Sequence, residues 1–201
     1  MTLAALQIEQ HLPATLTAPG LSEAEFLQFT QEFPDSTLEY THDGILLIRP
    51  PTDPETSARV TLVARRLGNW AEKDGRGMVI GPDGGFFLPN GARRSPDAAW
   101  FDRERWRRAK TPGTRFPVFT PEFVVEVRSP AQRGAGLREL QEKMAEYTDN
   151  GVELAWLIDP EEQTVTIYRP GRAAEVLRAP AAVAGGGSVS GFVLEMDGVL
   201  G

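Results

Sequence analysis

The chain has 201 residues, of which 41% are hydrophobic and 24% charged, and its formal net charge is −7. These are the values of an ordinary soluble globular domain. It has no cysteine and only two histidines, His11 and His42, which excludes disulfides, thiolate chemistry, cysteine-ligated zinc and multi-histidine metal sites. No apolar run approaches the ~20 residues of a membrane span, and the N-terminus lacks a secretion signal. We therefore expect a cytoplasmic protein whose chemistry uses carboxylates and lysines.

The N-terminal segment lacks a regular pattern, because two prolines and a glycine interrupt it. We expect residues 1–20 to form a flexible leader and residues 21–201 to form one domain. A helix should open this domain, since Ser22 is a good N-cap and Glu25, three residues later, completes a capping box.

A hairpin and a long helix are predicted next. The strands over residues 37–40 and 45–49 flank an Asp-Gly pair, which is typical of a hairpin turn. Asp53 is then a good N-cap, followed by a proline at the first helical position and by apolar residues at helical spacing. This helix should end at Gly75, because glycine is a natural C-terminal stop.

Strands dominate the rest of the chain, with one further helix. The expected strands cover residues 78–80, 86–88, 97–101, 122–128, 154–158, 164–169 and, at an edge, 192–196. The expected helix has Leu137, Leu140, Met144 and Tyr147 on its apolar face and closes at residues 149–151, whereas residues 181–187 resemble a linker. Without repeats or a second core, the pattern predicts one α/β domain, a central mixed β-sheet flanked by helices.

Within the strand expected over residues 122–128, Glu126 is the one glutamate that lies between apolar β-formers. Side chains alternate along a strand, so Glu126 shares one face with Val124 and Arg128. A carboxylate in a core strand is costly unless a cation, a metal ion or a proton compensates it. The alternative is a structural ion pair with Arg128 or another base.

A basic segment precedes this strand. Residues 93–115 contain eight basic and three acidic side chains, a local charge of +5, so the rest of the chain carries −12. Trp100 and Trp106 are interleaved with the bases. Such a surface could bind a polyanion, with Arg107 and Arg108 as candidate phosphate contacts, or it could be a solvated helix face.

Three separated features occur in a recognisable order. Asp97 follows a proline at the start of a strand, Glu126 lies within the next apolar strand, and Lys143 and Tyr147 lie one turn apart on the following helix. This order resembles the PD-(D/E)xK nuclease superfamily and, more closely, the Uma2 (DUF820) family of restriction-endonuclease-like proteins. The resemblance covers residues 22–192 and is carried by residues 38–44, 50–51, 95–97, 122–130, 143–147 and 156–160.

The resemblance implies a restriction-endonuclease-like fold and a Mg²⁺- or Mn²⁺-dependent endonuclease that hydrolyses phosphodiester bonds of DNA. Asp97 and Glu126 would bind the metal, since a hard divalent cation prefers such oxygen ligands. Lys143 would orient the attacking water and stabilise developing charge. Glu39, which matches the family's first acidic position, completes the catalytic set; its alternative is an exposed carboxylate at a strand end.

The chain departs from the superfamily pattern in two places. The usual lysine, two residues after the strand glutamate, is replaced by Arg128, which could bind phosphate but not act as a base. Lys143 is the natural replacement, and its alternative is a surface salt bridge to Glu139 or Glu146. Tyr147 is a further candidate substrate contact. The histidine that family members often carry at the start of the long helix is absent.

The sequence leaves other functions open. The acidic composition and Arg128 favour a catalytically silent binding or scaffold module that keeps the nuclease fold, whereas the complete set of Asp97, Glu126 and Lys143 favours the endonuclease. A metal-dependent hydrolase of another phosphate ester is a third alternative. We expect DNA as the partner and no membrane association, and a homodimeric assembly is left open.

Overall fold

The computed structural model describes residue 8, residues 10–110, residue 113 and residues 116–201. Its main sheet has six strands, in the order β11 (Glu175–Arg178), β10 (Thr164–Tyr168), β9 (Leu154–Asp159), β8 (Phe123–Val127), β7 (Ala98–Asp102) and β4 (Gly77–Ile80). Strands β8 and β9 run parallel, and the other neighbours run antiparallel. The predicted mixed sheet is confirmed.

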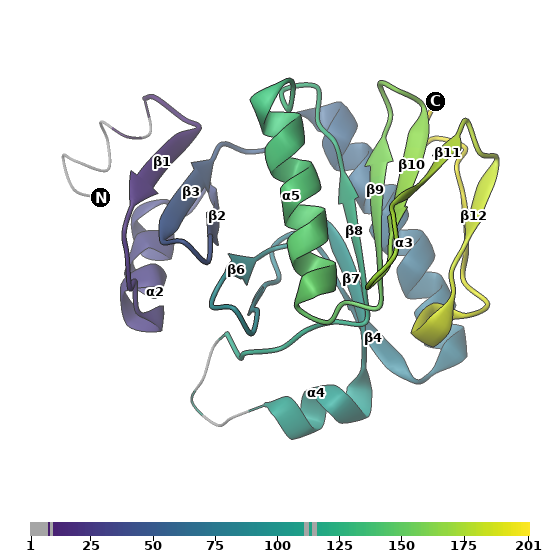
Figure 1. The fold of residues 1–201 in the computed structure, drawn as a ribbon, viewed down its shortest axis with the longest axis horizontal. Coiled ribbons are helices and arrows are strands. Elements are labelled where there is room, and N and C mark those ends of the chain that lie inside the picture. The colour runs from purple at the N-terminus through teal and green to yellow at the C-terminus, as the bar shows by residue number, and fades with distance from the viewer. Residues whose placement is uncertain (1–7, 9, 111–112, 114–115) are drawn as a thin grey trace.

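Two helices cover the opposite faces of this sheet (Figure 1). Helix α3 (Pro54–Asp74) begins at the N-cap Asp53, as predicted, and packs against the face that carries Val125. Helix α5 (Ala135–Asp149) packs against the face that carries Val124. Because side chains alternate along β8, Glu126 lies on the same face as Val124, toward α5.

A second sheet forms the N-terminal part of the molecule. Its strand order is β1 (Ala14–Thr17), β3 (Ile45–Arg49), β2 (Thr37–Tyr40), β6 (Arg93–Arg94) and β5 (Phe86–Phe87). Helix α2 (Glu23–Glu32) begins with the predicted capping box between Ser22 and Glu25 and buries Phe26 against this sheet. The predicted hairpin of β2 and β3 is confirmed.

Two segments that were predicted to lack regular structure contain β-strands. Residues 14–17 are not a flexible leader: they form β1, which pairs with β3, while residues 1–7 and 9 lie outside the described residues. The expected linker over residues 181–187 contains β12 (Ala182–Ala184), which pairs with β13 (Val193–Glu195), and the start of a 3₁₀ turn (Gly187–Val189). Strands β1 and β12 are short and built largely of small or polar residues, so the sequence pattern that would predict them is weak.

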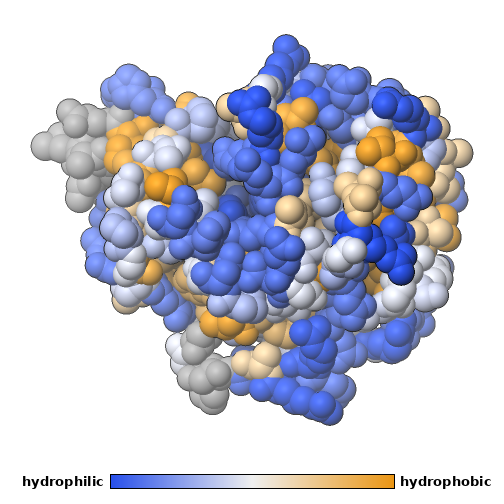
Figure 2. Space-filling view, in the orientation of Figure 1, coloured by the Kyte–Doolittle hydropathy of each residue, from blue (hydrophilic) through white to orange (hydrophobic). Residues whose placement is uncertain are grey.

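The described residues of the basic segment do not form one continuous surface. Residues 93–94 form the buried strand β6, and helix α4 (Arg103–Ala109), with Asp102 as its N-cap, follows β7. No residue of α4 is buried, and hydrophilic residues cover it in Figure 2. This exposure fits the solvated helix face given as an alternative, and it equally leaves the arginines of α4 accessible to a polyanion.

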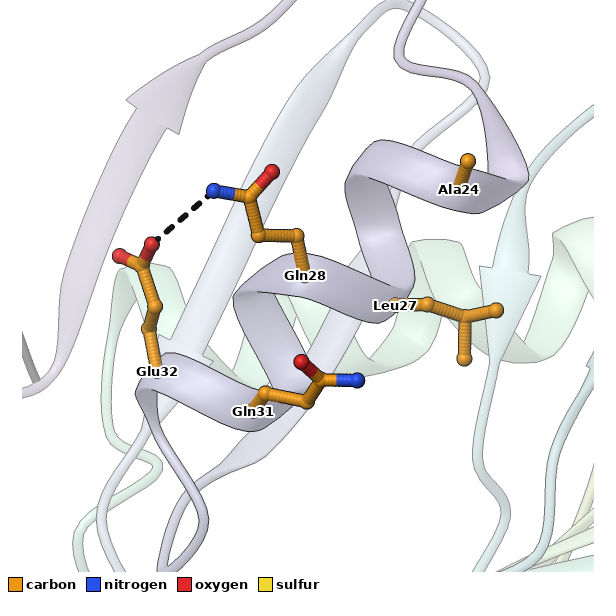
Figure 3. A pocket seen from close by; sticks show the side chains of 5 residues that line it. All are labelled: Ala24, Leu27, Gln28, Gln31 and Glu32. Carbon is orange, nitrogen blue, oxygen red and sulfur yellow. Dashed lines mark hydrogen bonds between the residues drawn. The ribbon is translucent and has the colours of Figure 1, made fainter.

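The outer face of α2 carries a shallow depression of about 600 Å³, lined by Ala24, Leu27, Gln28, Gln31 and Glu32 (Figure 3). The Gln28 amide donates a hydrogen bond to Glu32 at 3.2 Å. This single helix face holds one titratable side chain, so it offers no paired groups for acid–base or metal chemistry. No helix among the described residues is long and apolar enough to cross a membrane.

The close contact between Gly77 and Trp100 gives a test of the core. A Cβ at Gly77 would lie 2.1 Å from the Trp100 ring, whereas a Cβ at Gly68, in α3, meets nothing within 4 Å. We expect Gly77→Ala to lower the free energy of unfolding by about 1–3 kcal/mol through overpacking. Gly68→Ala is the matched control and should raise it by about 0.5–1 kcal/mol. Denaturant melts of both variants measure these changes; equal effects would contradict the packing described.

Candidate active site

The strand register brings Asp97 and Glu126 together. Asp97 directly precedes β7, and Ala98 of β7 pairs with Val125 of β8 in antiparallel register. One further step places Asp97 opposite Glu126, and opposed residues of antiparallel strands share a face with Cβ atoms about 5 Å apart. The two carboxylates that the sequence singles out therefore lie side by side, beneath α5.

Lys143 points from α5 into this face and bridges two carboxylates. Its side chain is 9% exposed, and its Nζ lies 2.7 Å from Oε1 of Glu126 and 2.8 Å from Oε1 of Glu39. The alternative of a surface salt bridge to Glu139 or Glu146 is wrong. Those two glutamates pair with arginines instead, and the lysine is buried.

Glu39, in β2, is buried rather than exposed at a strand end, so that alternative is also wrong. Its Oε1 accepts a hydrogen bond from the Ser95 N–H at 2.9 Å as well as the contact from Lys143. Its Oε2 lies 3.7 Å from Nη1 of Arg94. Because both oxygens have cationic or N–H partners, Glu39 is placed to hold Lys143 and is less available as a metal ligand.

Tyr147 contacts Glu126 from the same helix. It is fully buried, and its hydroxyl donates a hydrogen bond to Oε1 of Glu126 at 3.0 Å. The expectation that Tyr147 contacts substrate is corrected by this burial. Its position lets it orient the glutamate together with Lys143.

Each of the two opposed carboxylates keeps one oxygen without a protein partner. Oε1 of Glu126 receives both Tyr147 and Lys143, and Oδ2 of Asp97 accepts the Val127 N–H at 2.7 Å. The other oxygens, Oε2 and Oδ1, have no hydrogen bond within the described part of the chain. Asp97 is partly exposed, and the Glu126 side chain is 7% exposed.

Burial and neighbouring charges set the ionisation of the cluster. Burial raises the pKa of Asp97 to about 6, against the opposing effect of the Val127 N–H. Burial also raises the pKa of Glu126 to about 7; Lys143 opposes this, and Asp97 adds to it. Burial acts to raise the pKa of Glu39 too, but Lys143 and the nearby arginines outweigh it and lower that pKa to about 2.

The same balance keeps the lysine charged. Burial acts to lower the pKa of Lys143, but Glu126 and Glu39 outweigh this effect and raise it above its ordinary value. Lys143 is therefore protonated at neutral pH and acts as a hydrogen-bond donor.

Two residues that the sequence interpretation missed extend the network. Nε of Arg94, in β6, lies 2.6 Å from Oε2 of Glu146, in α5. The sequence holds only a weak signal that these residues belong to the site: Glu146 follows Lys143 by less than one helical turn, and Arg94 lies three residues before Asp97. Nothing in the local pattern of either residue indicates that the two would meet.

The connected cluster carries an excess of negative charge. It contains the carboxylates of Glu39, Asp97, Glu126 and Glu146 and the cations Arg94 and Lys143, four formal negative charges against two positive. No group of three or more Asp, Glu, His or Cys side chains able to hold a metal occurs in the described ranges. An ion here would have two carboxylate ligands and keep several waters, as Mg²⁺ does.

Arg128 takes a different role from the predicted one. Its buried guanidinium lies 2.7 Å from Oδ2 of Asp159 and 3.4 Å from Oε2 of Glu161, and its Nε donates to the carbonyl oxygen of Gln132. Of the alternative given for Glu126, an ion pair with Arg128 or another base, the structure shows the second form: Glu126 pairs with Lys143, and Arg128 does not contact it. Arg128 ties the end of β8 to the turn after β9, and its charge is already compensated.

The arginines of α4 lie apart from the cluster. Arg107 pairs with Glu104, and α4 follows the end of β7 opposite to Asp97, about 17 Å away along a five-residue strand. The contact of Arg107 and Arg108 with substrate stays a prediction, and it would take place at a distance from the carboxylates.

Comparisons with known proteins agree on one family. The model of the Uma2 family, described as "Putative restriction endonuclease", matches residues 23–197. A similar solved structure is the crystal structure of a "putative nuclease belonging to DUF820" from Anabaena variabilis ATCC 29413, which is 22% identical, with 88% of this chain and 96% of that chain covered and a TM-score of 0.70. No curated protein matches the chain. With this restriction-endonuclease-like fold and a family match over most of its length, the chain belongs to the Uma2 family.

Proposed function

We propose that this protein is a divalent-metal-dependent nuclease that hydrolyses phosphodiester bonds of DNA. One observation carries the proposal: Oε2 of Glu126 and Oδ1 of Asp97 accept no hydrogen bond from the described residues, and they belong to opposed residues beside a protonated lysine. The family description and the DUF820 neighbour support the nuclease class. The choice of Mg²⁺ or Mn²⁺ rests on the donor set, which is two hard oxygens with room for water.

Each side chain of the cluster would act through the hydrogen-bond donors or acceptors that its contacts within the protein leave free. A bound divalent ion would polarise the scissile phosphate and lower the pKa of a coordinated water. Glu126 and Asp97 would hold it with the two free oxygens. Lys143 has three N–H donors, and Glu39 and Glu126 engage two of them. The third is free to donate to the attacking water or to a phosphate oxygen that gains charge.

Proton and metal binding should compete at this site. The pKa values of Asp97 and Glu126, about 6 and 7, lie above their ordinary values of 3.8 and 4.5. The native state then holds more protons than the unfolded state between about pH 4 and 7, so these groups make stability fall as pH rises through that window. A metal ion binds the ionised pair and replaces those protons.

We predict that Mg²⁺ or Mn²⁺ raises the Tm little at pH 5 and most above about pH 7, because a ligand selective for the native state stabilises it. Melting curves at constant ionic strength measure the effect. Asp97→Asn should abolish the metal-dependent shift, whereas Asp35→Asn, at an exposed position, should retain it. A shift that is equal at all pH values, or that survives in Asp97→Asn, would contradict the site.

A second prediction separates Lys143 from Arg128. Lys143→Met should lower the rate of DNA cleavage about 10²–10³-fold per folded molecule, because it removes a donor to the transition state. Arg128→Met is the matched control: it also leaves a buried carboxylate unpaired and should cost about 3–5 kcal/mol of stability, yet keep cleavage in the folded fraction. Cleavage assays beside melting curves measure both.

The reverse pattern, an inactive Arg128→Met and an active Lys143→Met, would move the working cation to the strand. If the wild-type protein binds metal but cleaves no DNA with Mg²⁺ or Mn²⁺, the catalytically silent module replaces the nuclease.

A further inference from the structure

Among the described residues, Arg93 is a buried cation with no carboxylate in salt-bridge distance. Its side chain lies in β6, next to Arg94 but on the other face of the strand, and the residue is 5% exposed. The other buried cations of the described chain, Arg94, Arg128 and Lys143, each have a carboxylate within 4 Å, and Arg93 has none. An uncompensated buried charge is costly, so its surroundings call for an explanation.

Neutral groups compensate this charge only in part. Nη1 of Arg93 donates to the Leu38 carbonyl oxygen and to Oγ of Ser95, both at 2.6 Å. Its Cζ lies 4.7 Å from the centre of the Phe26 ring and 4.4 Å from that of Phe116, so two aromatic faces sandwich the guanidinium. Burial still lowers the pKa of Arg93 to about 10, although the charge of Glu39 acts to raise it, so Arg93 stays protonated at neutral pH.

Two nitrogens of the guanidinium keep unused donors. Nε is buried and has no hydrogen-bond partner. Nη2 has no hydrogen bond in the described part of the chain either, since both hydrogen bonds of the guanidinium come from Nη1. A Cβ on Gly85 would lie 2.8 Å from Nη2, and only glycine leaves this approach open.

Arg93 lines a cavity of about 180 Å³ between the loop after α2 and the turn before β5. Ser36 and Thr37 also line it, and their hydroxyls have no partner among the described residues; Asp83 is the one carboxylate of the lining. The volume is that of several water molecules and accommodates a tetrahedral oxyanion. Arg93, Ser36 and Thr37 border one space, and a guanidinium with two hydroxyls matches an ion with several acceptor oxygens.

We propose that this cavity is a phosphate-binding site, in which Nη2 of Arg93 supplies the charge and the hydroxyls of Ser36 and Thr37 supply further donors. The site is separate from the carboxylate cluster and does not depend on the nuclease proposal. It is nevertheless linked to it, because Ser95 accepts from Arg93 through its hydroxyl and donates to Glu39 through its N–H. Free phosphate and the terminal phosphate of a nucleic acid share this chemistry.

The first test uses inorganic phosphate as the probe, with chloride at matched ionic strength and a chelator present. We expect phosphate to raise the Tm of the wild-type protein by roughly 2–5 °C above chloride. Because substitution of Arg93 itself could prevent folding, the informative variant is Ser36→Glu, which places a carboxylate at the cavity. Ser36→Glu should raise the Tm in the absence of phosphate and should abolish the further rise in Tm that phosphate causes in the wild-type protein.

Two further variants complete the design. Ser57→Glu, on the exposed side of α3, adds the same charge elsewhere and should keep the phosphate response. Asp83→Asn removes the carboxylate that lines the cavity and should increase the rise in Tm that phosphate causes. A wild-type response no larger than that to chloride, or one that survives in Ser36→Glu, would overturn the proposal and leave Arg93 as a structural cation between two rings.

A second measurement separates the two sources of phosphate. One oligonucleotide is compared with and without a 5′-phosphate, again with chelator so that no cleavage occurs. Tighter binding of the phosphorylated form by wild type, lost in Ser36→Glu, identifies a terminal phosphate as the ligand. Equal binding of both forms together with a response to inorganic phosphate identifies the free anion.

Discussion

The buried contact of Lys143 with Glu39 and Glu126 is the interaction on which the rest of the structure depends. It joins three elements: Glu39 lies in the N-terminal sheet, Glu126 in the main sheet and Lys143 in the helix between them. Three buried charges are stable only when they are paired and hydrogen-bonded, so each fixes the position of the other two. The same contact occupies one oxygen of Glu126 and leaves the other free, which couples the packing of the two sheets to the chemistry of the site.

Stability alone gives no reason for this arrangement. Replacing a buried ion pair with apolar residues of similar volume is often neutral or stabilising, so such a cluster contributes little that hydrophobic packing could not. The cluster also has two more acidic than basic side chains, and the raised pKa values of two of its carboxylates mean that the full excess of negative charge develops only above about pH 7. A site built for stability would have balanced charges, whereas a site built to bind a cation has this excess. The two features together are typical of function.

The sequence predicted most of the fold that depends on local patterns. Helices α2 and α3 have strong caps, and the strand of Glu126 is a short run of apolar β-formers, so their existence and the face of Glu126 follow from neighbours in the chain. The burial of Glu39 and the pairing of Arg94 with Glu146 depend on how the two sheets pack, which no local pattern encodes. The role of Arg128 was mispredicted for the same reason: its partners are Asp159, the last residue of the next strand, and Glu161, in the turn after it.

The most direct test of this account is a crystal structure with Mn²⁺, located by its anomalous scattering. We expect one Mn²⁺ bound by Oε2 of Glu126 and Oδ1 of Asp97, with water in its other positions and with Lys143 still bonded to Glu39 and Oε1 of Glu126. A crystal without manganese at these oxygens, or with Lys143 displaced from Glu126 by the metal, would contradict the central claim that the lysine prepares this carboxylate pair for a cation.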